Sequence, residues 1–226
     1  MVYVKIKETK RRKVMSLKNY LFDFDGTLVD SMPHFASVMT RILDENGVKY
    51  PPDIIKIITP LGFVGTVKYY REELGIKLSE QEALDVMIRY LIDAYAHRVP
   101  LKDGVLEALL ELKRRGHSLN ILTASPHETL DPCLKRLKVY ELFDNVWSCN
   151  DFGTGKIDPE IYRMAAEKMG VSVDDVIFLD DNLNADEAAK RAGVTVIGVF
   201  DETSREYVDD MKVLCDGYIY NLKELL

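Results

Sequence analysis

The sequence of 226 residues lacks an apolar run long enough to cross a membrane, which excludes a transmembrane helix. It has few cysteines, and Cys133, Cys149 and Cys215 are odd in number and without the spacing of metal ligands. We therefore expect ordinary reduced thiols, as in a cytoplasmic protein. The four histidines also lack the i, i+4 pairing typical of a zinc site, so we interpret them as surface or packing residues.

Positive charge is scarce over most of the chain. The net charge of -7 argues against a nucleic-acid-binding protein, which normally has a basic face. Residues 1–18 alone carry a net charge of +6, which leaves -13 for the remainder. We interpret residues 1–17 as a basic, solvated N-terminal extension outside the active part, although alternating Val2, Val4 and Ile6 also fit a short edge strand. We expect neither nucleic acid nor a membrane among the partners.

An apolar run at residues 18–24 ends in two carboxylates, Asp23 and Asp25, followed by Gly26 and Thr27. A short apolar run closed by a glycine is typical of a buried strand leaving its sheet. Side chains alternate along a strand, so Asp23 and Asp25 should point to the same side. Because two like charges this close repel each other, the pair favours a divalent cation that prefers oxygen ligands, such as Mg2+.

The rest of the chain shows two patterns. From residue 31 to 100 the apolar spacing is helical, and no strand is predicted there. After Pro100, strands at 118–123, 145–148, 175–180, 194–199 and 217–220 alternate with helices at 103–115, 126–137, 159–169, 185–192 and 204–212. This alternation predicts an α/β fold with a Rossmann-like parallel sheet and helices on both faces. We expect the core at 18–30 and 101–226, with 31–100 inserted as a helical cap.

Ligands of open parallel sheets bind beyond the carboxyl ends of the strands, so we examined the residues that follow later strands. After residues 118–123, Ser125 fits a helix N-cap, with Pro126 at the first helical position and Glu128 completing a capping box. The N-terminus of that helix offers N–H groups to an anion, and the hydroxyl of Thr123 can donate to the same anion.

Two further segments carry charge at such positions. Lys156 lies in the loop before a helix that Asp158 caps, where a lysine can neutralise both Asp23 and an incoming anion. A second apolar strand runs directly into Asp180 and Asp181, and paired acids at a buried strand end favour a bound cation. The helix that follows is predicted to be capped by Asn184 with Glu187 and to end at Gly193.

The segment Asp23-Phe24-Asp25-Gly26-Thr27 resembles the first motif of the haloacid dehalogenase-like (HAD) phosphohydrolases. Thr123, Lys156 and Asp180-Asp181 stand where the second, third and fourth motifs of that family follow, so the resemblance covers residues 18–226. The helical insertion resembles that of the C1-capped subgroup, which includes phosphoglycolate phosphatase and beta-phosphoglucomutase. Ile157 departs from the family pattern, which usually has a proline there.

The resemblance implies Asp23 as nucleophile and Asp25 as general acid/base. It implies a phosphate site formed by Thr123, the amide of Ala124 and Lys156. It also implies Mg2+ held by Asp23, the backbone carbonyl of Asp25 and Asp181. Some members carry an acid four residues beyond the fourth-motif aspartate, where this chain has Ala185, so either Asp180 or Asp186 would supply a further carboxylate.

We therefore predict an Mg-dependent phosphatase that acts on a small phosphorylated metabolite through an aspartyl-phosphate, as a monomer or weak homodimer. The substrate stays open, and residues 62–66 are the loop we expect to face the core, because their two glycines permit close backbone approach. Two alternatives remain, a sugar phosphomutase on the same core and a non-catalytic protein that binds a phosphorylated ligand. Against the mutase, Phe35 stands where the sugar phosphomutases of the family carry a histidine.

Overall fold

The computed structural model describes residues 17–58 and 61–226, and the chain divides into two compact units. The sheet unit comprises the residues up to Asp30 and those from Pro100 to Leu226, and the helical unit comprises Ser31–Val99. The edge strand considered for Val2, Val4 and Ile6 lies outside the described residues, as does nearly all of the basic extension.

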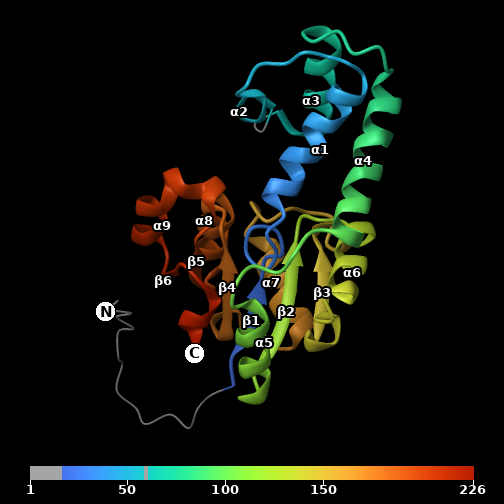
Figure 1. Cartoon of the computed structure of the whole chain (residues 1–226). Coiled ribbons are helices and arrows are strands. Elements are labelled where there is room, and N and C mark those ends of the chain that lie inside the picture. Colours follow the sequence, from blue (N-terminus) through green and yellow to red (C-terminus); the bar gives the residue numbers. More distant parts are fainter. Residues whose placement is uncertain (1–16, 59–60) are drawn as a thin grey trace. The chain divides into compact units, whose positions relative to one another are not determined.

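The sheet unit is built on six parallel strands in the order β3-β2-β1-β4-β5-β6 (Figure 1). Their bounds are β1 Asn19–Phe22, β2 Ser118–Thr123, β3 Asn145–Ser148, β4 Val176–Asp180, β5 Thr195–Val199 and β6 Gly217–Ile219. The first strand lies in the middle, where Phe22 stands opposite Ile121 of β2 and Leu179 of β4. The predicted parallel α/β sheet is thereby confirmed, and the chain reverses direction across the sheet at β1.

Helices cover both faces of this sheet, with α5 and α7 on opposite sides (Figure 1). They are α5 Val105–Arg114, α6 His127–Arg136, α7 Glu160–Met169, α8 Leu183–Ala192 and α9 Val208–Leu214, with 3-10 turns at Tyr140–Leu142, Cys149–Asp151, Val173–Asp175, Glu202–Tyr207 and Leu222–Leu225. Leu21 and Phe178 pack against α7 and α8, where Ile161 and Tyr162 are fully buried. Each such side chain contributes about 1.5–3 kcal/mol through burial.

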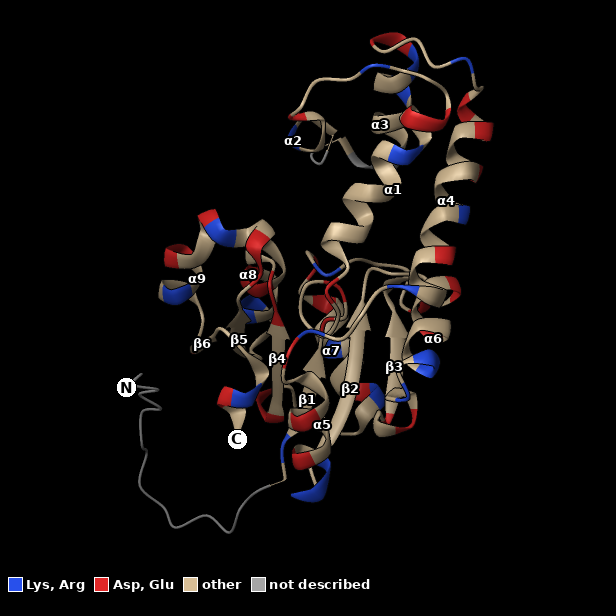
Figure 2. Cartoon of the chain, in the orientation of Figure 1, with Lys and Arg blue, Asp and Glu red and all other residues tan. Residues whose placement is uncertain are grey.

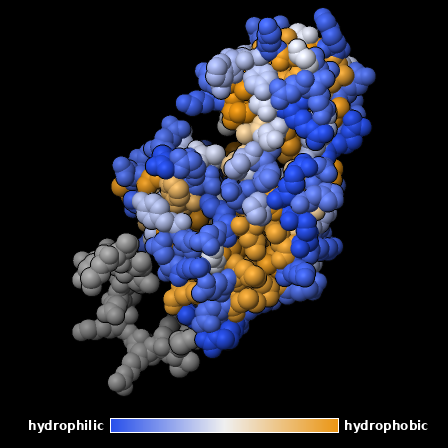
Figure 3. Space-filling model, in the orientation of Figure 1, coloured by the Kyte–Doolittle hydropathy of each residue, from blue (hydrophilic) through white to orange (hydrophobic). Residues whose placement is uncertain are grey.

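The other face of the sheet unit is covered in part by α5, whose inner residues Val105, Ala108, Leu109 and Leu112 are fully buried. Leu106 and Leu110, on its outer side, are 45% and 51% exposed, and apolar surface is visible over this part of the unit (Figure 3).

The helical unit consists of α1 Met32–Glu45, α2 Ile54–Ile58, α3 Gly62–Glu72 and α4 Glu80–His97, with no strand in its described residues. Its core forms where α1 and α3 meet α4, and the buried Tyr70 hydroxyl donates to the carbonyl of Met39 at 2.9 Å. The expectation of a loop at residues 62–66 is wrong, because these residues form the first turns of α3. The apolar contacts of the helix outweigh the weak helix preference of the two glycines.

Candidate active site

The residues after β1 form a tight turn at the carboxyl end of the sheet. Asp23 still donates its N–H to the carbonyl of Leu179 at 2.8 Å, which keeps it beside β4. Gly26 closes the turn with an N–H bond to the carbonyl of Val29 at 3.0 Å, and its φ is +74°. A Cβ at Gly26 would lie 2.4 Å from Oδ2 of Asp181. Only glycine suits both the backbone angle and this close approach.

Three carboxylates meet where β1 and β4 end, and Figure 2 shows acidic residues gathered at this edge of the sheet. One oxygen from each of Asp23, Asp180 and Asp181 lies within 4.8 Å of the other two, and all three side chains are buried. In the part of the chain that the structure describes, this is the one such group of three possible metal ligands. The sequence placed these residues at strand ends, and the parallel sheet brings them together.

Lys156 extends into this group from the loop before α7. Its Nζ lies 2.7 Å from Oδ1 of Asp23 and donates to Oδ2 of Asp180 at 2.6 Å. Tyr162 fixes the loop by donating its hydroxyl to the carbonyl of Lys156 at 2.8 Å. Burial alone would lower the pKa of Lys156, but Asp180 and Asp23 outweigh it and hold that pKa well above the usual value. The lysine is therefore a cation at neutral pH.

The carboxylates are not fully neutralised by this one cation. Burial, together with the charges of Asp180 and Asp25, raises the pKa of Asp23 to about 7 against the opposing effect of Lys156. Burial and the same crowding also raise the pKa of Asp181 well above its usual value. Oδ1 of Asp23 is buried, with the Lys156 ammonium 2.7 Å away as its charged partner. Such an excess of buried negative charge is what a divalent cation would offset.

Thr27 was named from the sequence as part of the first motif but was given no role, and it holds one of these carboxylates. Its buried hydroxyl donates to Oδ1 of Asp181 at 2.9 Å. The turn after β1 therefore supports Asp181 through both Gly26 and Thr27. The available signal was position alone, since Thr27 follows the glycine that lets the turn approach β4.

The expected capping box at the start of α6 is wrong. The helix begins at His127 with Pro126 in the N-cap position and without a side-chain cap. Ser125 instead donates its hydroxyl to Oδ2 of Asp25 at 2.5 Å. Thr123 is buried at the end of β2, and its oxygen accepts the N–H of Ser125 at 3.1 Å, which leaves its hydroxyl proton available to a ligand.

The two candidates for a further carboxylate lie in different surroundings. Asp180 is in the cluster, held by Lys156 and by the N–H of Asn182 at 2.8 Å. Asp186 is fully buried on α8, where it accepts from the thiol of Cys215 at 3.2 Å, and burial raises its pKa to about 8. This arrangement favours Asp180 over Asp186.

The cap of α8 also differs from the expectation. Asn182, rather than Asn184 with Glu187, accepts the N–H groups of the first helical turn, because the helix begins at Leu183. The predicted end at Gly193 is observed, with φ of +98°.

His127 has more carboxylate neighbours than its sequence surroundings suggested. Its Nδ1 lies 2.8 Å from Asp131 and its Nε2 lies 2.9 Å from Asp151. Hydrogen bonds that its ring N–H groups donate to Asp131 and Asp151 raise the pKa of this histidine. With its side chain 39% exposed, His127 is a surface residue that ties α6 to the turn after β3.

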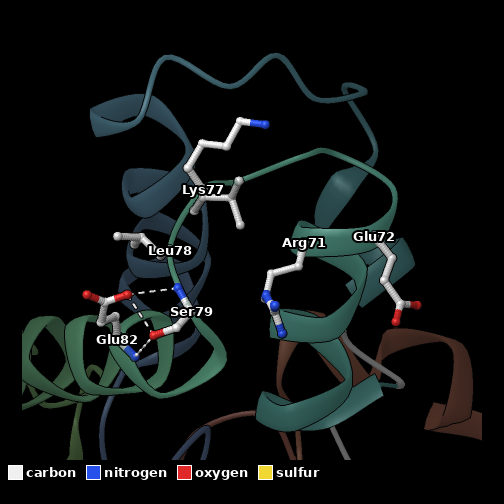
Figure 4. Close-up of a pocket in the computed structure, with 7 residues that line it drawn as sticks. Arg71, Glu72, Lys77, Leu78, Ser79 and Glu82 are labelled. Atoms are coloured by element: carbon white, nitrogen blue, oxygen red, sulfur yellow. Dashed lines mark hydrogen bonds between the residues drawn. The ribbon is translucent and has the colours of Figure 1, made fainter.

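The helical unit contains an open pocket of about 500 Å³ between α3 and the start of α4 (Figure 4). It is lined by Arg71, Glu72, Ile76, Lys77, Leu78, Ser79 and Glu82. Ser79 and Glu82 form a capping box at the start of α4, so their polar groups are used by the end of that helix.

No described helix is both long enough and apolar enough to cross a bilayer.

Comparison with known proteins identifies the family. The model of the haloacid dehalogenase-like hydrolases matches residues 20–199. The chain is 31% identical to the pyrophosphatase PpaX of Bacillus velezensis over 180 residues, which are 79% of this chain and 81% of that protein. It is 26% identical to a phosphoglycolate phosphatase of Pseudomonas putida over 214 residues, 87% of this chain and 78% of that protein.

Solved structures show the same relationship. A Thermotoga maritima protein provisionally named a beta-phosphoglucomutase has a TM-score of 0.81 and 25% identity, covering 93% of this chain and 97% of its own. The family match extends over most of the chain and includes the strands that carry the carboxylates and Thr123. The chain therefore belongs to the haloacid dehalogenase-like hydrolase family, within which its curated relatives are phosphatases.

Proposed function

We propose that this HAD-like phosphatase hydrolyses phosphomonoesters of small metabolites through an aspartyl-phosphate formed on Asp23. The observation that carries the proposal is the surroundings of Asp23, a residue that is 5% exposed and follows β1. Its carboxylate pairs with the ammonium of Lys156 and lies beside the carboxylates of Asp180 and Asp181. A protein that only bound a phosphorylated ligand would gain nothing from a buried acid here, because its charge repels phosphate.

The two aspartates of the turn have separate roles in the reaction. Asp23 attacks phosphorus in line, so that an oxygen–phosphorus bond forms as the bond to the leaving oxygen breaks. Asp25 gives a proton to that leaving oxygen and then removes one from the water that hydrolyses the aspartyl-phosphate. The bond from Ser125 to Asp25, 2.5 Å long, orients the carboxyl group between these two transfers.

The oxygens of the transferred group need positive and hydrogen-bonding partners. We propose Thr123, the amide of Ala124 and Lys156 for this purpose, because they lie after β2 and before α7, at the ends of the strands. Lys156 also favours the ionised form of Asp23, because its charge opposes the rise of the aspartate pKa. One cation thereby serves both the nucleophile and the phosphoryl group.

The residues fit a magnesium ion. The donor set is composed of buried carboxylate oxygens, and two of the three carboxylates, Asp23 and Asp180, share the single ammonium group of Lys156. We propose that Asp23, Asp181 and the backbone carbonyl of Asp25 hold the ion, with Asp180 adding negative charge. When bound, Mg2+ would offset the charge of the phosphate and orient it toward Asp23.

The inserted helices are the proposed site of substrate choice. We assign residues 31–100 as the cap and residues 18–30 and 101–226 as the catalytic core, following the resemblance to capped members of the family. Relatives named for pyrophosphate and phosphoglycolate favour a small phosphorylated metabolite as substrate. We expect a cytoplasmic enzyme, monomeric or weakly dimeric, that binds neither nucleic acid nor membranes.

A phosphomutase is the second candidate, supported by the structural similarity to the provisionally named beta-phosphoglucomutase. Phe35 argues against mutase activity, since the sugar phosphomutases of the family carry a histidine at that position. His34 precedes it, but consecutive residues of a helix do not share a face. Water is therefore the proposed acceptor of the phosphoryl group.

The test is a screen of phosphate release from phosphoglycolate, pyrophosphate and sugar phosphates in the presence of Mg2+. We expect release from at least one small phosphomonoester and its loss after chelation. No release from any compound would contradict the proposed hydrolysis. The same protein should be given beta-glucose 1-phosphate with a bisphosphate primer, where rapid glucose 6-phosphate formation with little free phosphate would instead support the mutase.

A further inference from the structure

Lys102, outside the predicted site, joins three parts of the sheet unit. Its Nζ donates to the carbonyl of Gly26 at 2.5 Å, to the carbonyl of Phe200 at 2.7 Å and to Oδ2 of Asp201 at 2.9 Å. An ammonium group has three donors, so these acceptors use all of them. Its own N–H donates to the carbonyl of Leu28 at 3.0 Å. Lys102 is thus bound to the turn after β1 through both backbone and side chain.

Asp201, the carboxylate that pairs with Lys102, is also held by several hydrogen bonds. Asp201 is 5% exposed, and its Oδ1 accepts both the N–H of Thr203 at 3.0 Å and the hydroxyl of Thr203 at 2.7 Å. Burial would raise the pKa of Asp201, but the bonds from Thr203 and Lys102 outweigh it and hold that pKa below the usual value. The acceptor of Lys102 is therefore a charged group fixed by its own loop.

The turn that Lys102 holds is also the one that touches Asp181. Gly26 approaches that carboxylate so closely that a Cβ would collide with it, and Thr27 donates to it at 2.9 Å. A shift of the Gly26 carbonyl would therefore move the Thr27 hydroxyl that holds Asp181 and the space that Gly26 leaves for its carboxylate. A largely buried ion pair is by itself weak evidence for a role in stability, because well-packed apolar residues of similar volume often serve as well or better.

We propose that Lys102, anchored by Asp201, is a positioning residue that holds the Gly26–Thr27 turn and through it sets the orientation of Asp181 for metal binding. This inference rests on the proposed function, since it assigns Asp181 as a ligand. Outer partners of metal ligands typically change metal affinity about 10–100-fold when removed. Lys102 contacts Gly26 and acts on Asp181 only through the Gly26–Thr27 turn. We therefore expect a change of Mg2+ affinity at the lower end of that range.

The test compares Lys102→Met with the wild type by calorimetric titration of Mg2+ in the absence of substrate. We expect Mg2+ affinity to fall about tenfold. At saturating Mg2+ the KM for substrate should stay within about twofold, since Lys102 does not touch the phosphate residues. Lys102→Arg keeps the charge and should recover part of the Mg2+ affinity. Lys190→Met is the matched control, because Lys190 pairs with Asp216 at 2.7 Å and does not contact the turn.

A folded Lys102→Met protein that binds Mg2+ as tightly as the wild type would overturn the inference. If that variant does not fold, Asp201→Asn is measured in the same way, since it weakens the anchor while keeping an oxygen for Thr203. Unchanged Mg2+ affinity in Asp201→Asn would then overturn it. The proposed function fails separately, if the wild-type protein binds Mg2+ but releases phosphate from no phosphomonoester.

Discussion

Asp23 and Asp25 differ in surroundings although one residue separates them. Asp23 lies against Lys156 among buried carboxylates, and Asp25 accepts the hydroxyl of Ser125 and is partly exposed. Lys156 and the strand ends hold the first in place, as its proposed attack on phosphorus requires. The second can exchange protons with a leaving group and with water. The environment of each carboxylate, more than its residue type, separates the two proposed roles.

Replacement of the proposed nucleophile gives the sharpest test at this scale. Asp23→Asn should lower kcat at least about 1,000-fold, because an amide is a poor nucleophile. The fold should persist, since the change removes a buried negative charge beside Asp180 and leaves Lys156 one partner. Phosphate release and thermal melting provide the measurements, with the exposed Asp209→Asn as control. A variant with near-normal turnover would exclude the covalent route through Asp23.

Gly26 can be tested against a glycine of similar backbone angle. Gly26→Ala and Gly170→Ala both place a side chain at positive φ, +74° and +71°, and this backbone conformation by itself should cost each variant about 1–2 kcal/mol of stability. At Gly170 no atom lies within 4 Å of the added Cβ, whereas at Gly26 the carboxylate of Asp181 lies 2.4 Å away. Only Gly26→Ala should therefore lose Mg2+ binding and phosphatase activity. Equal activity in the two variants would show that the close approach to Asp181 is unimportant.

The start of α6 shows how an element is positioned by contacts outside itself. The first turn lacks a side-chain cap, since Ser125 donates to Asp25 instead. The side chain of His127, the first residue of α6, bonds to Asp131 of the same helix and to Asp151 in the turn after β3. The helix end is thereby held by partners from the other strand ends, and the segment after Thr123 stays beside the proposed nucleophile.

This link should depend on pH. Asp131 and Asp151 raise the pKa of His127 above its unfolded value of about 6.5, so its stabilisation is complete below that pH. The stabilisation is lost as pH rises through the folded pKa. Because the side chain is 39% exposed, we expect no more than about 1 kcal/mol. Melting of wild type and His127→Gln should differ at pH 5.5–6 and converge by about pH 8.

The exposed His97→Gln, which removes a similar pair with Asp93, is the control for general effects of losing a histidine. A melting difference between wild type and His127→Gln that stays constant with pH would exclude the charged link.

Across the whole molecule negative charge prevails, and three buried carboxylates of the sheet unit lie together. The pKa of Asp23, raised to about 7, exceeds its unfolded value of about 3.9. Below about pH 7 the metal-free protein therefore favours the protonated form of Asp23. Its contribution to stability is complete below the unfolded pKa and is lost as pH rises from about 4 through 7.

Melting in a chelator should accordingly shift to lower temperature between pH 5 and 8, and added Mg2+ should reverse most of the shift. A hundredfold excess of ligand over Kd adds about 2.7 kcal/mol to the unfolding free energy. Asp23→Asn should show a shallower dependence on pH in the chelator, which separates Asp23 from His127. No rise of Tm with Mg2+ at pH 8 would contradict the metal assignment.

Much of the architecture follows from local sequence pattern. The strands β2 and β3 were predicted with their observed bounds, because buried parallel strands are short apolar runs closed by turn residues. The alternation after Pro100 identified the parallel sheet, whose strands all end at one edge. That rule, together with the resemblance to the four family motifs, predicted that Asp23, Lys156, Asp180 and Asp181 would lie together.

Other features depend on residues far apart in the chain, and only the tertiary structure decided them. A hydroxyl such as that of Ser125 can cap its own helix or bind a carboxylate 100 positions away, and the local sequence shows only the first possibility. The link between Lys102 and Asp201 spans 99 positions and has no local signature. The sequence determined which residues end the strands, whereas the packing of the turn after β1 against β4 determined which side chains support Asp181.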